Sequence, residues 1–224
     1  MEELKYCYKY PRPSVTTDCV IFGFDKEKLA VLLIQRGFDP YKGHWAFPGG
    51  FLNMDEDAET GAKRELLEET GFVAETVEQF GAFSTVDRDP RGRVITIAYY
   101  ALVQKGKVQG SDDASEARWF PLSEIPPLAF DHKEVLLKAL QSLKERLHFT
   151  PIGLDLLPKQ FSFEQLFRLY ECIPGFKLDF FEFKRQILAM QYLWQVDVVD
   201  GLELFQFDET KYMNLKKESF RLDF

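Results

Sequence analysis

Three carboxylates recur at helical spacing in the segment from Gly50 to Phe72, GFLNMDEDAETGAKRELLEETGF. On a helix with 3.6 residues per turn, Glu65, Glu68 and Glu69 stand at positions i, i+3 and i+4 and share one face. Like charges this close repel one another, and a bound cation removes the repulsion. Oxygen-only ligands on a water-accessible helix suit a hard ion such as Mg²⁺ or Mn²⁺ better than zinc. The residues alone therefore predict a metal-binding helix, with a solvated acidic helix as the alternative.

The ends of this helix are also encoded locally. Asp57 is a suitable N-cap, residues 58–70 contain good helix formers, and Gly71 suits the left-handed position that follows a helix. The preceding pair, Gly49 and Gly50, allows either a close backbone approach or a positive φ. We therefore expect a helix introduced by a glycine loop.

The same segment resembles the Nudix box, Gly-x5-Glu-x7-Arg-Glu-U-x-Glu-Glu-x-Gly-U, in which U is a bulky aliphatic or aromatic residue. Every fixed position from Gly50 to Gly71 is matched, with Leu66 and Phe72 at the U positions. The resemblance implies an α/β/α sandwich with a mixed sheet, and a glycine loop beside a metal site. It also implies metal-dependent cleavage of the diphosphate in a nucleoside diphosphate-linked metabolite.

The resemblance gives each residue of the box an expected role. Glu65, Glu68 and Glu69 would hold Mg²⁺ or Mn²⁺, which neutralises phosphoryl charge and activates a water molecule. Glu56 and Arg64 would brace the junction between the loop and the helix. The general base is expected among three downstream acids that the sequence does not rank, Asp87, Asp89 and Glu116.

Three arginines, Arg88, Arg91 and Arg93, lie in the loop at residues 87–93. Alone, they would more often form an exposed, solvated turn. Beside a metal helix they predict a diphosphate clamp, because guanidinium groups bind phosphate oxygens bidentately. The run RDPRGR is similar to the loop of Nudix proteins that handle ADP-ribose, so a nucleotide-sugar ligand, ADP-ribose first, is expected. Candidates for stacking on an adenine are Trp45, Phe83 and Tyr99, although an aromatic residue at any one position more often belongs to the core.

Composition limits the classes of protein that fit. The chain has 224 residues, 46% hydrophobic content and 22 Phe, which is ample for a packed core. No apolar run is long enough for a membrane span, and the charged N-terminus lacks the apolar region of a signal peptide. Cys7, Cys19 and Cys172 are too widely spaced for a zinc pattern or a disulfide framework. We therefore expect a reduced, cytoplasmic protein without a membrane partner.

Further elements follow from hydrophobic patterning in residues 1–148, the expected Nudix domain. The strand signals, which are apolar or β-branched runs, cover residues 15–22, 29–35, 77–86, 94–103 and 116–121. The first two strands are expected to pair across a polar turn. A second helix is expected at 131–147, with Asp131 as its N-cap and Glu134 completing a capping box.

The remaining residues are expected to form a linker at 149–159 and a small winged-helix-like α+β domain at 160–224. Ser162 and Asp179 are predicted N-caps of two helices, ending near Ile173 and Leu193 and separated by Pro174-Gly175. Asp200-Gly201 then predicts a hairpin between strands at 194–199 and 202–207. This order, after a Nudix domain, resembles the Nudix-related transcriptional regulators.

The expected wing departs from the basic wing of those regulators, because its sequence VDVVDGLELFQF contains no Lys or Arg. Residues 147–224 hold 9 Lys and Arg against 12 Asp and Glu, a net charge of −3. Non-specific DNA affinity comes mostly from neutralising phosphates, so this field is unfavourable. The basic residues that could serve are Lys184, Arg185, Lys216, Lys217 and Arg221. A packing or dimerisation role is therefore favoured over DNA binding.

Two functions compete at the level of sequence. The complete box favours a Nudix pyrophosphohydrolase, because a pure sensor has no need for all three carboxylates. The alternative is a ligand-sensing transcriptional regulator that binds DNA through its C-terminal winged helix. Since related sandwiches commonly dimerise, a homodimer is expected.

Overall fold

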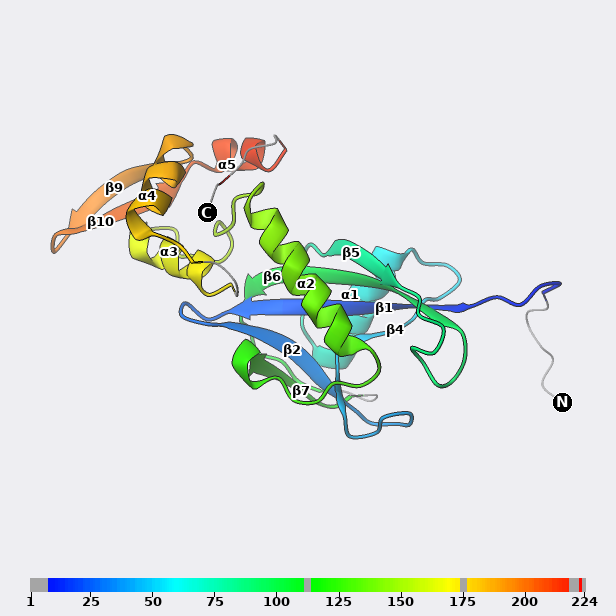
Figure 1. The fold of residues 1–224 in the computed structure, drawn as a ribbon. Coiled ribbons are helices and arrows are strands. Elements are labelled where there is room, and N and C mark those ends of the chain that lie inside the picture. The colour runs from blue at the N-terminus through cyan, green and yellow to red at the C-terminus, as the bar shows by residue number, and fades with distance from the viewer. Residues whose placement is uncertain (1–7, 111–113, 174–176, 218–221, 223–224) are drawn as a thin grey trace.

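A seven-stranded mixed sheet forms the centre of the N-terminal part of the molecule (Figure 1). The structure is a computed structural model that describes residues 8–110, 114–173, 177–217 and 222. The strands are β1 (Ser14–Phe24), β2 (Leu29–Arg36), β3 (Trp45–Ala46), β4 (Gly49–Phe51), β5 (Glu78–Phe83), β6 (Val94–Gln104) and β7 (Ala114–Pro121). β1 pairs with β6 in parallel, and its pairing with β2 is antiparallel, with Phe22 opposite Val31. The mixed sheet and the predicted pairing of the first two long strands are therefore confirmed.

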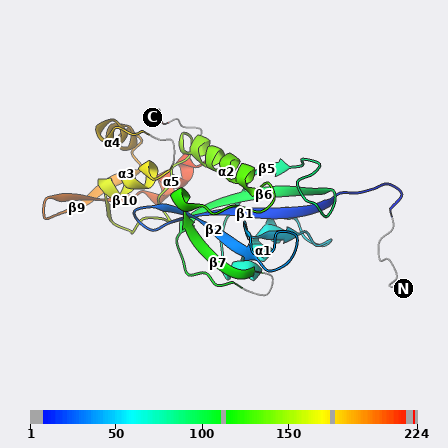
Figure 2. The same cartoon turned by 60° about the horizontal axis from the view of Figure 1, so that its bottom comes forward.

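Two helices cover opposite faces of this sheet, α1 (Ala58–Thr70) and α2 (His132–Leu147) (Figure 2). The alternation of side chains along β1 explains this arrangement. Cys19 and Ile21 belong to the cluster that contains buried residues of α1, whereas Val20 and Phe22 belong to the cluster that contains buried residues of α2. The strand is buried on both faces, and the α/β/α sandwich follows.

The caps of α1 are those that the sequence predicts, but the cap of α2 is not. The Asp57 carboxylate accepts a hydrogen bond from the Thr60 backbone N–H at 2.8 Å, and Gly71 adopts a φ of 65°. Asp131 precedes α2 but its side chain makes no capping hydrogen bond, so the predicted capping box with Glu134 is wrong. The Asp131 carboxylate is instead paired with Arg88. A tertiary ion pair has displaced the local cap.

The C-terminal part contains the helices and the hairpin of a winged helix. Its elements are the short strand β8 (Phe161–Ser162), α3 (Phe163–Glu171), α4 (Phe180–Ala189), β9 (Leu193–Val199), β10 (Leu202–Phe207) and α5 (Glu209–Leu215). A short 3-10 helix, η1 (Leu122–Glu124), belongs to the N-terminal part and lies between β7 and α2 in the sequence. The predicted capping box at Ser162 and Gln165 is confirmed. The Asp200-Gly201 hairpin is confirmed as well, with Leu202 opposite Val199.

The second of these helices is shorter than the sequence predicts. α4 ends at Ala189 rather than at Leu193, because Gln191 has a φ of 56° and Leu193 pairs with Phe207 in the hairpin. Helix α5 was not predicted. The predicted break at Pro174-Gly175 lies outside the described residues, as do Cys7 and Arg221.

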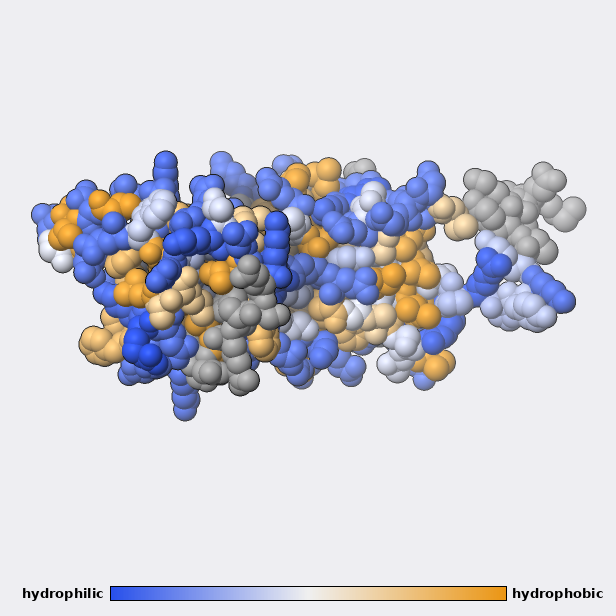
Figure 3. Space-filling view, turned by 90° about the horizontal axis from the view of Figure 1, so that it is seen from above, coloured by the Kyte–Doolittle hydropathy of each residue, from blue (hydrophilic) through white to orange (hydrophobic). Residues whose placement is uncertain are grey.

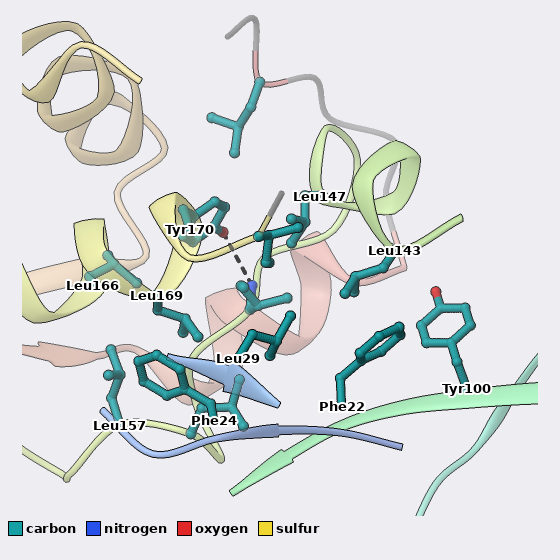
Figure 4. Packing of buried hydrophobic residues seen from close by; sticks show 14 of the residues in the cluster. Phe22, Phe24, Leu29, Tyr100, Leu143, Leu147, Leu157, Leu166, Leu169 and Tyr170 are labelled. Atoms are coloured by element: carbon teal, nitrogen blue, oxygen red, sulfur yellow. Dashed lines mark hydrogen bonds between the residues drawn. The ribbon is translucent and has the colours of Figure 1, made fainter. Parts of the chain in front are cut away.

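The segment expected as a linker is packed between the two parts of the molecule. Ile152, Leu156 and Leu157 are buried in a hydrophobic cluster that also holds residues of β1, α2 and α3 (Figure 4). The Tyr170 hydroxyl accepts a hydrogen bond from the Ile152 backbone N–H at 3.2 Å. One continuous hydrophobic core therefore joins the sheet to the winged helix.

Exposed apolar side chains gather on the hairpin β9–β10, at the left in Figure 3. They are Trp194, Val196, Val198, Val199 and Leu202. Within the part of the chain that the structure describes, no helix has the length and apolar character needed to cross a bilayer.

Candidate ligand and metal site

A cavity of about 370 Å³ opens between the ends of β1 and β2, the glycine loop, α1 and the loop at residues 87–93. It brings together seven of the ten predicted site residues, which are Gly49, Gly50, Arg64, Glu65, Glu69, Arg88 and Arg91. Glu56, Glu68 and Arg93 are not among its lining residues. Side chains that lie far apart in the sequence thus face one space.

The glycine loop touches the α1 carboxylates directly. The Gly49 backbone N–H donates to the Glu69 carboxylate at 2.8 Å, and Glu69 is 8% exposed. A Cβ on Gly50 would lie 2.5 Å from the Glu65 carboxyl carbon, and a Cβ on Gly49 would lie 2.1 Å from the Thr17 carbonyl oxygen. Of the two explanations for this glycine pair, the structure supports the close backbone approach.

Arg64, which lines the cavity, is surrounded by three carboxylates. Its guanidinium contacts Glu56 at 2.6 Å, Glu65 at 2.8 Å and Glu68 at 3.0 Å, and it also donates to the Phe51 carbonyl at 3.2 Å. The hydrogen bonds from Arg64 lower the pKa of Glu56 to about 2. This geometry agrees with the bracing role predicted for Glu56 and Arg64, and that role stays a prediction.

The donor set is suited to a hard divalent cation, although the structure does not gather it around one point. Among the described residues, no group of three His, Cys, Asp or Glu side chains is close enough to hold a metal ion. Glu65 and Glu69 line the cavity, while the side chain of Glu68 is 57% exposed and pairs with Arg64. Burial raises the pKa of Glu65, since its ionised form loses water there. A cation beside Glu65 and Glu69 would offset that cost, and oxygen ligands fit such an ion.

The three loop arginines have different surroundings. Arg91 lines the cavity, is 42% exposed in its side chain, and contacts Asp89 at 2.7 Å. Arg88 also lines the cavity but is buried against Asp131 at 2.7 Å. The Arg93 guanidinium donates to the Ser84 carbonyl at 2.6 Å and is not a lining residue. Arg88 and Arg91 are thus placed to contact a ligand, whereas Arg93 supports the loop.

Only one of the three predicted general bases lines the cavity. Asp89 is a lining residue, and Asp87 and Glu116 are not. Partial burial raises the pKa of Asp89, but hydrogen bonds from the Arg91 side chain and backbone N–H together lower it by more, so the pKa of Asp89 is below its usual value. Asp89 is therefore ionised and committed to Arg91.

A buried pair that sequence reasoning missed lies at the floor of the cavity, formed by Asp18 on β1 and His132 on α2. The His132 Nδ1 accepts a hydrogen bond from the Phe47 backbone N–H at 3.0 Å, and its ring stacks on Phe47. The His132 Nε2 lies 3.6 Å from the Asp18 carboxylate. Burial lowers the pKa of His132, so the neutral imidazole is favoured. The available sequence signal was the single acid inside the apolar run VTTDCVIF.

The aromatic wall of the cavity also differs from the residues predicted for stacking. Trp45, Phe83 and Tyr99 do not line it. The aromatic lining residues are Phe38, Phe47, Phe51 and Phe130. The Arg91 guanidinium lies 5.2 Å from the centre of the Phe51 ring and 5.8 Å from that of Phe130. The Arg36 guanidinium lies 4.8 Å from the Phe130 ring centre, so a planar base would meet both rings and cations here.

The two basic residues of α4 are paired with neighbouring acids. Lys184 on α4 contacts Glu203 of the hairpin at 2.8 Å. Arg185 on α4 pairs with Glu182, and its hydrogen bonds lower the pKa of Glu182 to about 2. Any contact of α4 with phosphate groups must therefore compete with these pairs.

Comparison with known proteins identifies both parts of the chain. A family model described as the NUDIX domain matches residues 12–139, and one described as the NrtR DNA-binding winged helix domain matches residues 153–201. An ADPR responsive transcriptional repressor, NtrR, from Acinetobacter baylyi is 34% identical over 193 residues, which are 84% of this chain and 77% of the relative.

Two further proteins extend the comparison. An ADP-ribose pyrophosphatase from Methanocaldococcus jannaschii is 40% identical over 134 residues, covering 60% of this chain and 77% of the relative. The crystal structure of Shewanella oneidensis NrtR in complex with a 27mer DNA has a TM-score of 0.75 and 27% identity, covering 93% of this chain and 99% of that chain. The pyrophosphatase thus matches a region as long as the Nudix domain, whereas the Acinetobacter baylyi repressor and Shewanella oneidensis NrtR match most of the chain.

Proposed function

This chain belongs to the Nudix family, and on that premise we propose that it binds ADP-ribose in the cavity and cleaves its diphosphate with a divalent metal ion, Mg²⁺ or Mn²⁺. The observation that carries the proposal is the cavity lined by both Glu65 and Glu69 of α1 and by Arg88 and Arg91 of the loop. The pyrophosphatase relative supports the same chemistry. ADP-ribose supplies the diphosphate for the arginines and the adenine for the aromatic wall.

The residues of the chain divide the work of such a reaction. Glu65 and Glu69, with Glu68 beside them, would hold the metal, which when bound supplies charge neutralisation and an activated water. Arg91 and Arg88 would bind the phosphate oxygens. Asp89 orients Arg91, and the Gly49 N–H fixes the Glu69 carboxylate.

A turnover assay tests this proposal. We expect AMP and ribose 5-phosphate from ADP-ribose with Mg²⁺ or Mn²⁺ and neither product in chelator. Glu69→Gln should reduce kcat by orders of magnitude, because it weakens a ligand and the Gly49 contact together. Lys63→Ala on the same helix is the matched control, since Lys63 pairs only with Glu59 among the described salt bridges. Intact ADP-ribose with both metals would sink the hydrolase.

A second function is favoured by the winged helix, and we propose that it binds DNA under control of the same ligand. The sequence alone disfavoured DNA because the wing is acidic. The match to a DNA-binding winged helix and the likeness to a whole regulator bound to DNA support DNA binding more strongly than the charges suggested. The two functions are compatible, since one cavity serves both.

Fluorescence anisotropy with labelled upstream DNA of the protein's own gene tests the second function. We expect saturable binding at 50 mM salt with a shallow salt slope up to 200 mM, because Lys184 and Arg185 are engaged by acids. Affinity no better than that for a scrambled duplex would leave the winged helix as a packing domain. We also propose a homodimer, with a mass in solution of twice 26.1 kDa. Light scattering at 26.1 kDa would contradict it.

A further inference from the structure

Helix α2 lies along the sheet and ends beside the C-terminal domain (Figure 1). Its 16 residues span about 24 Å at the rise of an α-helix. Its first residue, His132, lines the cavity, and its last, Leu147, is fully buried in the core shared with the winged helix. The helix is therefore one continuous element that links the cavity to the core of the winged helix.

At the cavity end, the residues that begin α2 hold groups that a ligand would contact. Arg88 donates to the two carboxylate oxygens of Asp131 at 2.9 Å and 2.7 Å, and lies 3.5 Å from Asp18. His132 accepts from the Phe47 N–H, two residues before Gly49. A change at Arg88 or in the glycine loop therefore acts on the first turn of α2.

The Asp131 carboxylate has two competing sets of partners. An aspartate that precedes a helix ordinarily accepts hydrogen bonds from the backbone N–H groups of the first turn. Here it makes no such bond, because it faces Arg88. An anion bound beside Arg88 would compete with Asp131 for the guanidinium. The released carboxylate could then cap α2, so that the helix start has two alternative arrangements.

At the far end, α2 shares a hydrophobic cluster with the winged helix and is followed by a polar residue that contacts Leu222. Leu143 and Leu147 lie in one cluster with Leu166, Leu169 and Tyr170 of α3 (Figure 4). His148 follows α2 and is linked to Leu222 twice. The His148 Nδ1 lies 2.8 Å from the Leu222 carbonyl oxygen, and the Leu222 N–H donates to the His148 carbonyl at 2.8 Å. A displacement of α2 would therefore disturb the packing of α3 and the contacts of Leu222.

We propose that Asp131 and His132 are positioning residues through which α2 reports occupancy of the cavity to the winged helix. Ligand phosphate draws Arg88 away from Asp131, Asp131 turns to the first-turn N–H groups of α2, and the shifted helix repositions α3. This mechanism rests on the proposed binding of ADP-ribose. The ion pair between Arg88 and Asp131 is the contact on which the regulation depends.

Hydrogen–deuterium exchange on the full chain tests the relay without depending on a ligand. Asp131→Asn keeps a capping side chain but removes the ion pair with Arg88. Without ligand, this variant should show several-fold changes in amide exchange in α2 and α3 relative to wild type. Lys133→Ala, an exposed position on the same turn, is the matched control and should leave exchange unchanged. Equal exchange in the two variants would overturn the relay.

The coupling between ligand and DNA gives the second readout. In wild type, saturating ADP-ribose should change the Kd for DNA by about 5- to 150-fold, the usual range for coupled sites. Asp131→Asn should bring that ratio close to one while ADP-ribose still binds by calorimetry. An unchanged ratio in Asp131→Asn contradicts the relay. Absence of ADP-ribose binding by wild type contradicts the proposed function instead, and the exchange comparison still decides the relay.

A second variant covers a failure of Asp131→Asn to fold. His148→Gln alters the far end of α2 without touching the cavity. ADP-ribose should bind it with wild-type affinity and change exchange at the start of α2, but the change in α3 should be reduced. Wild-type changes in α3 would count against transmission through α2.

Discussion

Replacing Arg91 by alanine tests the proposed ligand geometry in the most detail. A charge-assisted hydrogen bond to phosphate contributes ~1.5–3 kcal/mol. The replacement also leaves the Asp89 carboxylate, only 3% exposed in its side chain, without its partner at 2.7 Å. Repulsion between unit charges ~8 Å apart is ~2 kcal/mol at an effective dielectric constant of ~20. Arg91 itself is 42% exposed, so solvent screening reduces both effects.

We therefore expect Arg91→Ala to weaken ADP-ribose binding by ~2–4 kcal/mol, about 30-fold to 1,000-fold in Kd. The double variant Arg91→Ala/Asp89→Asn should recover about tenfold or more, because it removes the unpaired repulsive charge of Asp89. Isothermal titration calorimetry in chelator measures binding without turnover. Arg93→Ala is the control and should stay within about twofold of wild type, because Arg93 contacts backbone carbonyls outside the cavity. An unchanged Kd in Arg91→Ala, or no recovery in the double variant, would refute the clamp.

Three other outcomes follow from the same contacts. Gly50→Ala should abolish turnover, since its Cβ would meet the Glu65 carboxyl group at 2.5 Å and displace it; because only the end of a flexible side chain must move, the loss of stability should stay below the ~1–3 kcal/mol of an overpacked core, and an unaltered kcat would contradict this. In urea unfolding, the free energy of unfolding should fall as the pH drops through about 6.5, by at most ~1.4 kcal/mol per pH unit, because the pKa of His132 is lowered by folding and the unfolded chain takes up the proton first. His132→Gln should flatten this dependence. Glu65, whose pKa is raised by folding, acts in the opposite direction in both proteins. Glu182→Gln should strengthen DNA binding at 50 mM salt by releasing Arg185, and Arg185→Ala should reduce the salt slope by about 0.9; anisotropy titrations that find both variants equal to wild type would exclude a phosphate contact by Arg185.

Local signals explain which parts of the fold the sequence could predict. Asp57, Gly71 and Ser162 each act on backbone groups within a few residues, so their capping roles are legible without tertiary information. Asp200-Gly201 specifies its hairpin in the same way. The α/β/α order follows from strands and helices with clear periodicity.

Tertiary competition explains what the sequence could not predict. Asp131 carries a strong local capping signal, but Arg88, 43 positions away, takes its carboxylate. His132 gives no signal at all, because its role depends on the Phe47 N–H and on Asp18 of β1, both of which are far away in the sequence. Arg93 lies two positions from Arg91 in the same loop, and only the loop conformation directs it to the Ser84 carbonyl. Long-range pairing decides these contacts, and spacing does not encode it.

The most direct measurement of the central claim is the affinity of wild-type protein for its upstream DNA with and without ADP-ribose, in chelator to prevent turnover. We expect saturating ADP-ribose to shift the anisotropy midpoint at least about fivefold. AMP, which lacks the diphosphate, should shift it far less. A midpoint that does not move with ADP-ribose, in a protein that binds both the ligand and the DNA, would contradict control of the winged helix from the Nudix cavity.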